Sequence, residues 1–211
     1  MLELQALDLA CVRAGREVFA DVEFAVRGGE MLAVTGPNGA GKSSLLRLIA
    51  GLLAPARGQV TLHGAAAEYT VGEQAHYVGH LDAFKPSLTV EENLAFWKAV
   101  LGGGNEVRGA LAAVGLDALA HLPALYLSAG QRRRLSLSRL LVAARPIWLL
   151  DEPSSALDAA GVTMLGEVMG AHLAGGGLLL VAEHGRLARA PTRELQLGRA
   201  TAAARRSRGQ A

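Results

Sequence analysis

The sequence is poor in cysteine, in aromatic side chains and in long apolar runs. Its 211 residues include one cysteine, Cys11, so an intrachain disulfide is excluded. Aromatic residues make up 4% of a chain that is 51% hydrophobic, so Leu, Val and Ala must fill the core. The longest membrane-like stretch without charge, between Glu167 and Glu183, is too short to span a bilayer and contains three consecutive glycines. We therefore expect a cytoplasmic protein that reaches a membrane only through partners.

Neither sign of charge predominates in the chain. Lys and Arg total 21 and Asp and Glu total 19, which gives a net charge of +2. Four of the arginines lie in the tail 199–211, which has no acidic residue, and without it acidic residues outnumber basic ones. This balance argues against a nucleic-acid partner. The tail is typical of a disordered, solvated end, with binding to anionic lipid as the alternative.

Hydrophobic periodicity predicts strands that alternate with helices. Alternating residues predict antiparallel strands over 2–12 and 18–26. Short apolar strands are predicted at 31–35, 58–62, 76–79, 147–150 and 178–182. Helices are predicted over 42–52, 89–114 (broken by glycines at 102–104), 130–144 and 159–173. This order predicts an α/β fold with a largely parallel sheet, formed by residues 1–80 and 128–198, and a helical lobe inserted at 81–127.

A phosphate-binding loop is predicted between the strand at 31–35 and the helix at 42–52. Residues Gly36-Pro37-Asn38-Gly39-Ala40-Gly41-Lys42-Ser43 match the pattern G-x-x-x-x-G-K-[ST], and Ser44 follows. The glycines let backbone N–H groups point at phosphate oxygens, and the helix start adds a positive dipole end. We expect Lys42 to bridge the β- and γ-phosphates and Ser43 to bind Mg²⁺. Since the guanine-reading pattern Asn-Lys-x-Asp is missing, the expected ligands are ATP and Mg²⁺.

Two carboxylates follow the apolar strand predicted at 147–150. That strand delivers Asp151 and Glu152 to the carboxyl edge of the sheet, where open α/β folds bind ligands. We expect Asp151 to hold the Mg²⁺ shell and Glu152 to orient or deprotonate the attacking water. Taken alone, the pair could be an acidic turn after a core strand. With a phosphate loop upstream, the pattern favours ATP hydrolysis.

The segment Leu127-Ser128-Ala129-Gly130-Gln131 begins a predicted helix, with Ser128 as its N-cap. Ser155-Ala156-Leu157-Asp158 follows the two carboxylates. Together with the phosphate loop, these segments resemble the signature, Walker B and D-loop of the ABC ATPases over nearly the whole chain. Ala129 replaces a glycine that is usual in the signature. The resemblance implies a P-loop NTPase of the ABC nucleotide-binding type, with a mostly parallel sheet, an N-terminal antiparallel part and an inserted helical lobe.

The same resemblance implies a shared site. In ABC ATPases two ATP-binding subunits meet head to tail, and each ATP lies between the phosphate loop of one chain and the signature of the other. By this likeness Ser128, Gly130 and Gln131 would act on the partner's γ-phosphate, and Asp158 of the D-loop would also belong to the nucleotide-binding residues. His184 matches the switch histidine that contacts the γ-phosphate.

Three positions depart from the ABC pattern. His80 stands where a glutamine usually senses Mg²⁺ and the γ-phosphate; a neutral imidazole can accept from a metal-bound water, or this is an ordinary loop histidine. Arg13 stands where an aromatic ring usually stacks on adenine; a guanidinium can also stack, or this is a plain surface arginine. Gly185 replaces a common acid. The phosphate-loop lysine and both Walker B carboxylates are retained, so hydrolysis remains expected.

Several short sequence segments resemble one particular ABC family, the CcmA family of ATP-binding subunits of the cytochrome c maturation haem exporter. They are Cys11-x-Arg13, Tyr77-Val78-Gly79-His80-Leu81-Asp82, Lys85 before Leu88-Thr89-Val90-Glu91-Glu92-Asn93-Leu94, Ala129, and Trp148-Leu149-Leu150-Asp151-Glu152-Pro153. The likeness implies membrane subunits CcmB and CcmC as partners at the cytoplasmic face of the inner membrane. Hydrolysis would drive release of the haem-loaded chaperone CcmE. An ABC transporter for a different cargo is the alternative.

Coupling to a membrane subunit is expected through the helical lobe. Phe84, Phe96 and Trp97 are candidates for a groove that receives a partner helix. The alternative is that these aromatic side chains form the lobe's own core.

Overall fold

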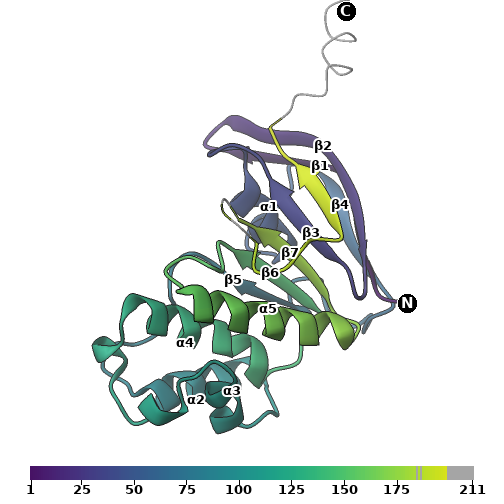
Figure 1. Cartoon of the computed structure of the whole chain (residues 1–211). Coiled ribbons are helices and arrows are strands. Elements are labelled where there is room, and N and C mark those ends of the chain that lie inside the picture. Colours follow the sequence, from purple (N-terminus) through teal and green to yellow (C-terminus); the bar gives the residue numbers. More distant parts are fainter. Residues whose placement is uncertain (184, 186, 199–211) are drawn as a thin grey trace, which may run out of the picture.

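Two sheets form the centre of the computed structural model, which describes residues 1–183, 185 and 187–198 (Figure 1). The antiparallel sheet has the order β2–β1–β4, with bounds β1 Glu3–Arg13, β2 Arg16–Arg27 and β4 Arg57–His63. The second sheet has the order β5–β6–β7–β3–β8, and all of its neighbouring strands run parallel. Its bounds are β3 Met31–Thr35, β5 Ala75–Val78, β6 Ile147–Asp151, β7 Leu178–Ala182 and β8 Arg193–Gln196. The predicted fold class is confirmed.

Five α-helices join these strands within the described chain. They are α1 Lys42–Ile49, α2 Val90–Leu101, α3 Val107–Ala113, α4 Ala129–Val142 and α5 Ala159–Ala174, with 3₁₀ turns at Asp117–Leu119 and Ala124–Tyr126. The predicted break in the helix at 89–114 is confirmed, because α2 ends at Leu101 and is capped by Gly102, whose φ of 66° is left-handed. The strand β8 is an element that the sequence pattern does not predict.

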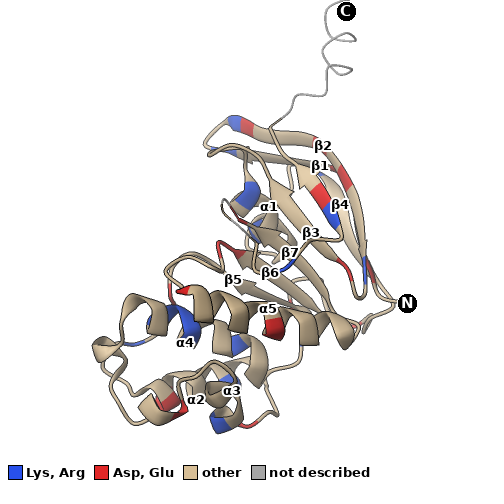
Figure 2. Ribbon diagram, viewed as in Figure 1, with Lys and Arg blue, Asp and Glu red and all other residues tan. Residues whose placement is uncertain are grey.

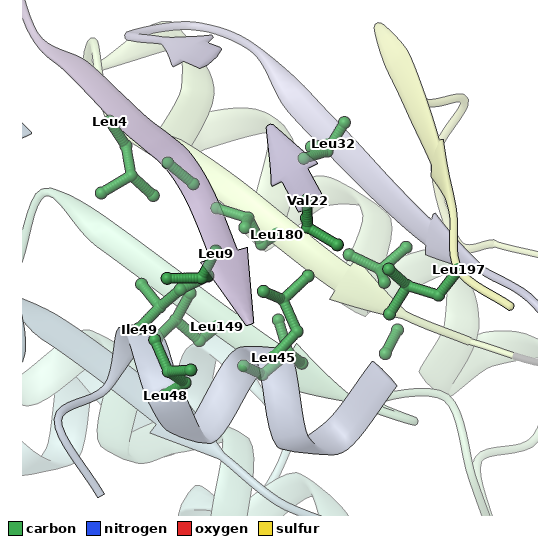
Figure 3. Packing of buried hydrophobic residues seen from close by; sticks show 14 of the residues in the cluster. Leu4, Leu9, Val22, Leu32, Leu45, Leu48, Ile49, Leu149, Leu180 and Leu197 are labelled. Carbon is green, nitrogen blue, oxygen red and sulfur yellow. The ribbon is translucent and has the colours of Figure 1, made fainter. Parts of the chain in front are cut away.

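Helix α1 packs against both sheets in one apolar cluster (Figure 3). Its buried Leu45 and Ile49 lie close to Leu9 of the antiparallel sheet and to Leu149 of β6. Neighbouring residues of β6 point to opposite faces of the sheet, so Trp148 joins the cluster under α4 and α5 instead. Both faces of β6 and β7 are therefore covered, which explains their continuous apolar sequences.

The inserted helices have an apolar cluster of their own. Val90 and Leu94 of α2 and Leu111 of α3 are fully buried in it. Helix α4 belongs to both clusters, because Leu135 packs with the inserted helices while Leu137 packs against the parallel sheet. Helix α4 is therefore the physical link between the inserted helices and the sheet.

Charges of both signs are spread over the described ribbon, with Lys and Arg along α4 (Figure 2). Among the described residues, no helix has the length and apolar character needed to cross a bilayer. The only cysteine of the chain, Cys11, is buried in β1.

Candidate nucleotide site

The loop between β3 and α1 has the backbone geometry that a phosphate cradle needs. Gly36, Gly39 and Gly41 have φ values of 136°, 81° and 98°, which side chains rarely adopt. A Cβ at Gly36 would also overlap the carbonyl oxygen of Leu197, and one at Gly41 would overlap Val18 of β2. Glycine is therefore required at 36 and 41 for space as well as for conformation.

Lys42 is held at this loop although it is only 7% exposed. Its Nζ donates to the carbonyl oxygen of Gly36 at 2.7 Å and to that of Pro37 at 3.1 Å. These hydrogen bonds hold the lysine side chain against the loop, so that its ammonium group lies near the positive N-terminal end of α1. The local arrangement concentrates positive potential where a triphosphate would sit.

Asp151 meets the phosphate loop from the end of β6. Its Oδ1 accepts the Ser43 hydroxyl at 3.0 Å, and its Oδ2 accepts the Tyr77 hydroxyl at 3.3 Å. Arg47 Nε in turn donates to the Tyr77 oxygen at 3.1 Å. Burial raises the pKa of Tyr77 from its ordinary value, so the phenol remains a protonated donor. Both oxygens of the Asp151 carboxylate are thus held in place.

Glu152 occupies a strained position directly after β6. Its φ is 49°, in the left-handed region that few residues other than glycine adopt. Its backbone N–H donates to the carbonyl oxygen of Ala182 at 2.7 Å, which fixes the turn against β7. Backbone strain at a carboxylate beside a phosphate loop is a feature of functional sites.

These groups line one pocket of about 300 Å³. Its lining consists of Arg13, Val18, Asn38, Gly39, Gly41, Lys42, Ser43, Ser44, Asp151 and Glu152. Arg13 therefore lines the same pocket as the phosphate loop. His80 is exposed and lines a different pocket, together with Arg47 and Tyr77.

The signature segment lies at the start of α4, outside the lining of this pocket. Ser128 Oγ accepts the backbone N–H of Gln131, and Gln131 Oε1 accepts the N–H of Ser128 at 2.8 Å. This reciprocal pair is a capping box that leaves Ser128 exposed. Gly130 lies close to the D-loop, since a Cβ there would be 3.0 Å from the carbonyl oxygen of Ala156.

Another predicted site residue, Asp158, lies at the start of α5. Asp158 caps α5 by accepting the N–H of Gly161 at 2.8 Å, and 3.4 Å separates it from Arg134 Nη2. His184 is outside the described residues. Its neighbour Glu183 accepts the hydroxyl of Ser154 at 2.6 Å and its N–H at 3.2 Å, which joins the ends of β6 and β7.

Three further residues, Tyr77, Arg47 and Arg133, are hydrogen-bonded to Asp151 or to its partners, and the sequence does not predict these contacts. The alternation of β5 was the available signal for Tyr77, since it predicts that this side chain and Ala75 share the face toward α1. No local pattern marks Arg133, whose partners lie in distant segments.

The described residues include no group of three or more His, Cys, Asp or Glu side chains that could enclose a metal. The Ser43 hydroxyl and the Asp151 carboxylate nevertheless offer oxygen atoms within hydrogen-bonding distance of each other. Such a pair suits Mg²⁺, which prefers oxygen and usually shares its shell with substrate phosphates. The donor set is therefore compatible with a magnesium ion bound together with a nucleotide.

Comparison with known proteins decides the family. The family model described as ABC transporter matches residues 19–155, which include the phosphate loop, the signature segment and both carboxylates. The chain belongs to the ABC transporter family. Its parallel sheet and its glycine-rich loop after β3 are those expected of an ABC ATP-binding domain.

Curated relatives place this ABC chain in a narrower family. The protein of Nitrobacter winogradskyi named cytochrome c biogenesis ATP-binding export protein CcmA is 59% identical over 93% of this chain and 98% of its own length. The CcmA protein of Bradyrhizobium diazoefficiens is 57% identical over the same shares. This ABC chain is accordingly a member of the CcmA family. A solved structure of an ATP-binding subunit of an ABC transporter is 28% identical, with a TM-score of 0.75 over 85% of this chain and 79% of that one.

Proposed function

We propose that this protein is the ATP-hydrolysing subunit of an ABC exporter complex that acts in cytochrome c biogenesis. The observation that carries the proposal is the pocket that gathers Lys42, Ser43, Asp151 and Glu152, in a chain 59% identical to a protein named cytochrome c biogenesis ATP-binding export protein CcmA. Membership of the ABC family supports the ATPase activity. The names of the relatives support the cytochrome c role.

The phosphate loop and Lys42 would hold the triphosphate. Binding would exchange the bonds of Lys42 Nζ to Gly36 and Pro37 for bonds to phosphate oxygens, with little movement of the side chain. Ser43 and Asp151 would hold Mg²⁺, which supplies charge neutralisation at the β- and γ-phosphates. Arg13 would stack on the base through its guanidinium plane.

Glu152 would orient the attacking water and accept its proton. Its position after β6 places the carboxylate at the edge of the pocket beside Asp151. His184 would contact the γ-phosphate. A second ATP-binding subunit, arranged head to tail, would add Ser128, Gly130 and Gln131, since these residues lie outside the pocket of their own chain. A helix N-terminus such as that of α4 is a suitable anion site.

The membrane partners would resemble CcmB and CcmC, which places the chain at the cytoplasmic face of the inner membrane. Hydrolysis would drive release of haem-loaded CcmE. Phe84, Phe96 and Trp97 line one pocket of about 370 Å³ on the inserted helices, which suits a helix of the membrane subunit. Phe96 is 56% exposed, so the alternative that all three rings are internal core does not describe it.

The test replaces Glu152 by Gln in host cells that carry no other copy of the gene. We expect the complex to bind ATP but not to hydrolyse it, so that mature c-type cytochromes vanish from a haem stain while haem accumulates on the periplasmic chaperone. The matched control is Glu167→Gln, a change of the same kind at an exposed position of α5.

The outcomes separate the two parts of the proposal. If the Glu152→Gln cells make normal cytochromes c while the purified complex has lost its ATPase activity, the proposed ATPase activity stands. The proposed role in cytochrome c biogenesis then fails, and the transporter has a different cargo. Near-normal turnover by the Glu152→Gln complex would contradict the role of Glu152 in hydrolysis.

A further inference from the structure

Arg133 is a buried cation inside the nucleotide-binding half of the molecule. Arg133 is 2% exposed, although its side chain is one of the largest in the described core. Burying an arginine is unfavourable unless its charge and its N–H donors find partners. The partners of Arg133 therefore indicate what the protein gains from this placement.

Its hydrogen-bond acceptors among the described residues are all backbone carbonyl oxygens at the carboxyl edge of the parallel sheet. Nη1 donates to Gly79 at 2.7 Å, and Nη2 donates to Asp151 at 3.0 Å and to Glu152 at 2.8 Å. Nε donates to Pro153 at 3.1 Å. One planar guanidinium thus ties the end of β5 to three consecutive residues at the end of β6.

The tied residues are those that carry the predicted chemistry. Asp151 contacts Ser43, and Glu152 has the left-handed backbone that aims its side chain at the nucleotide pocket. Gly79 precedes His80 in the loop that follows β5. A strained turn persists only when its surroundings hold it, and the two bonds of Nη2 hold both carbonyls that flank this turn.

Arg133 also links the turn to the signature. It lies on α4, whose N-terminus is capped by Ser128 and Gln131. A helix transmits displacement along its axis, so a shift of the signature end moves the guanidinium and the Glu152 turn together.

We propose that Arg133 is a positioning residue that sets the orientation of Glu152 for hydrolysis and couples it to the signature end of α4. The inference rests on the proposed ATPase function. Lysine cannot replace the arginine in this role, because one ammonium at the end of a flexible chain cannot reach four carbonyls in a fixed planar pattern. The nearest carboxylate, Asp82, is 3.8 Å from Nη1 and supplies the countercharge.

The experiment compares Arg133→Lys with Arg108→Lys in the complex assembled with its membrane subunits. Arg108 is an exposed arginine of α3 that pairs with Glu91, so its variant controls for the loss of a guanidinium as such. The measurements are kcat and KM for ATP, and the affinity for a fluorescent ATP analogue. We expect Arg133→Lys to lower kcat about 10- to 100-fold while KM and analogue affinity stay within about twofold, because bonds from a charged donor hold the turn and not the nucleotide.

Each result is decisive. Unchanged kcat in Arg133→Lys would overturn the proposal, and so would a loss of analogue binding or of folding together with turnover, since that marks a purely structural residue. The parent complex and Arg108→Lys report on the proposed function itself: if neither hydrolyses ATP, the ATPase assignment fails independently of Arg133.

Discussion

Replacing Gly41 by alanine tests whether the phosphate loop is fixed by packing as well as by backbone conformation. Gly41 precedes α1 with a φ of 98°, and an added Cβ would lie 2.5 Å from Val18 Cγ1 and 2.8 Å from Phe19 Cδ1. The left-handed conformation costs an L-residue about 1–2 kcal/mol. Overpacking against Phe19, which is 7% exposed, adds about 1–3 kcal/mol. The free energy of unfolding should therefore fall by about 2–5 kcal/mol.

Gly39→Ala is the matched control for this prediction. Gly39 has a φ of 81°, but no atom lies within 4 Å of an added Cβ, so only the conformational cost of about 1–2 kcal/mol applies. In a domain of this size each kcal/mol lowers Tm by about 2–4 °C. Thermal unfolding without nucleotide, followed by circular dichroism, should give a clearly lower Tm for Gly41→Ala than for Gly39→Ala. Equal values would refute the argument from packing.

Two further predictions concern binding and pH. Arg13→Ala should weaken ATP binding about 5- to 150-fold in a titration with a fluorescent analogue, because stacking on a base is worth about 1–3 kcal/mol; unchanged affinity would make Arg13 a surface residue. Burial lowers the pKa of His76 to about 4. As the pH falls below about 6.5, this imidazole is therefore protonated in the unfolded chain but stays neutral in the folded protein. Stability from His76 is complete above pH 6.5 and falls by about 3 kcal/mol toward pH 4. His76→Gln should flatten the fall of Tm between pH 7 and pH 4.5, and the exposed His121→Gln should not.

The phosphate loop and the acidic strand end were predictable because local rules determine them. A glycine-rich turn between an apolar strand and a helix has few conformations, and an apolar strand in a parallel sheet must end at the ligand-binding edge. The structure accordingly brings Lys42, Ser43, Asp151 and Glu152 into one pocket. The N-cap at Ser128 follows from the same kind of local rule.

Other features depend on contacts between distant segments, which no local pattern encodes. Strand β8 has charged and polar residues at exposed positions, and it exists through its parallel pairing with β3. The Tyr77–Asp151 bond joins residues 74 apart, and Arg133 reaches Gly79 across 54 residues. The placement of His80 in a pocket with Arg47 also depends on how the chain turns after β5.

The two tryptophans of the chain make separate parts of the molecule visible to fluorescence. Trp97 lies on α2 with the guanidinium of Arg139 4.5 Å from its ring centroid, whereas Trp148 lies in the sheet, stacked at 3.9 Å on His172. The contact of the Trp97 ring with Arg139 of α4 would change if α2 moved relative to α4. The Trp148 ring is enclosed in the packed centre. An emission change confined to Trp97 would therefore show the inserted helices shifting while the sheet stays intact.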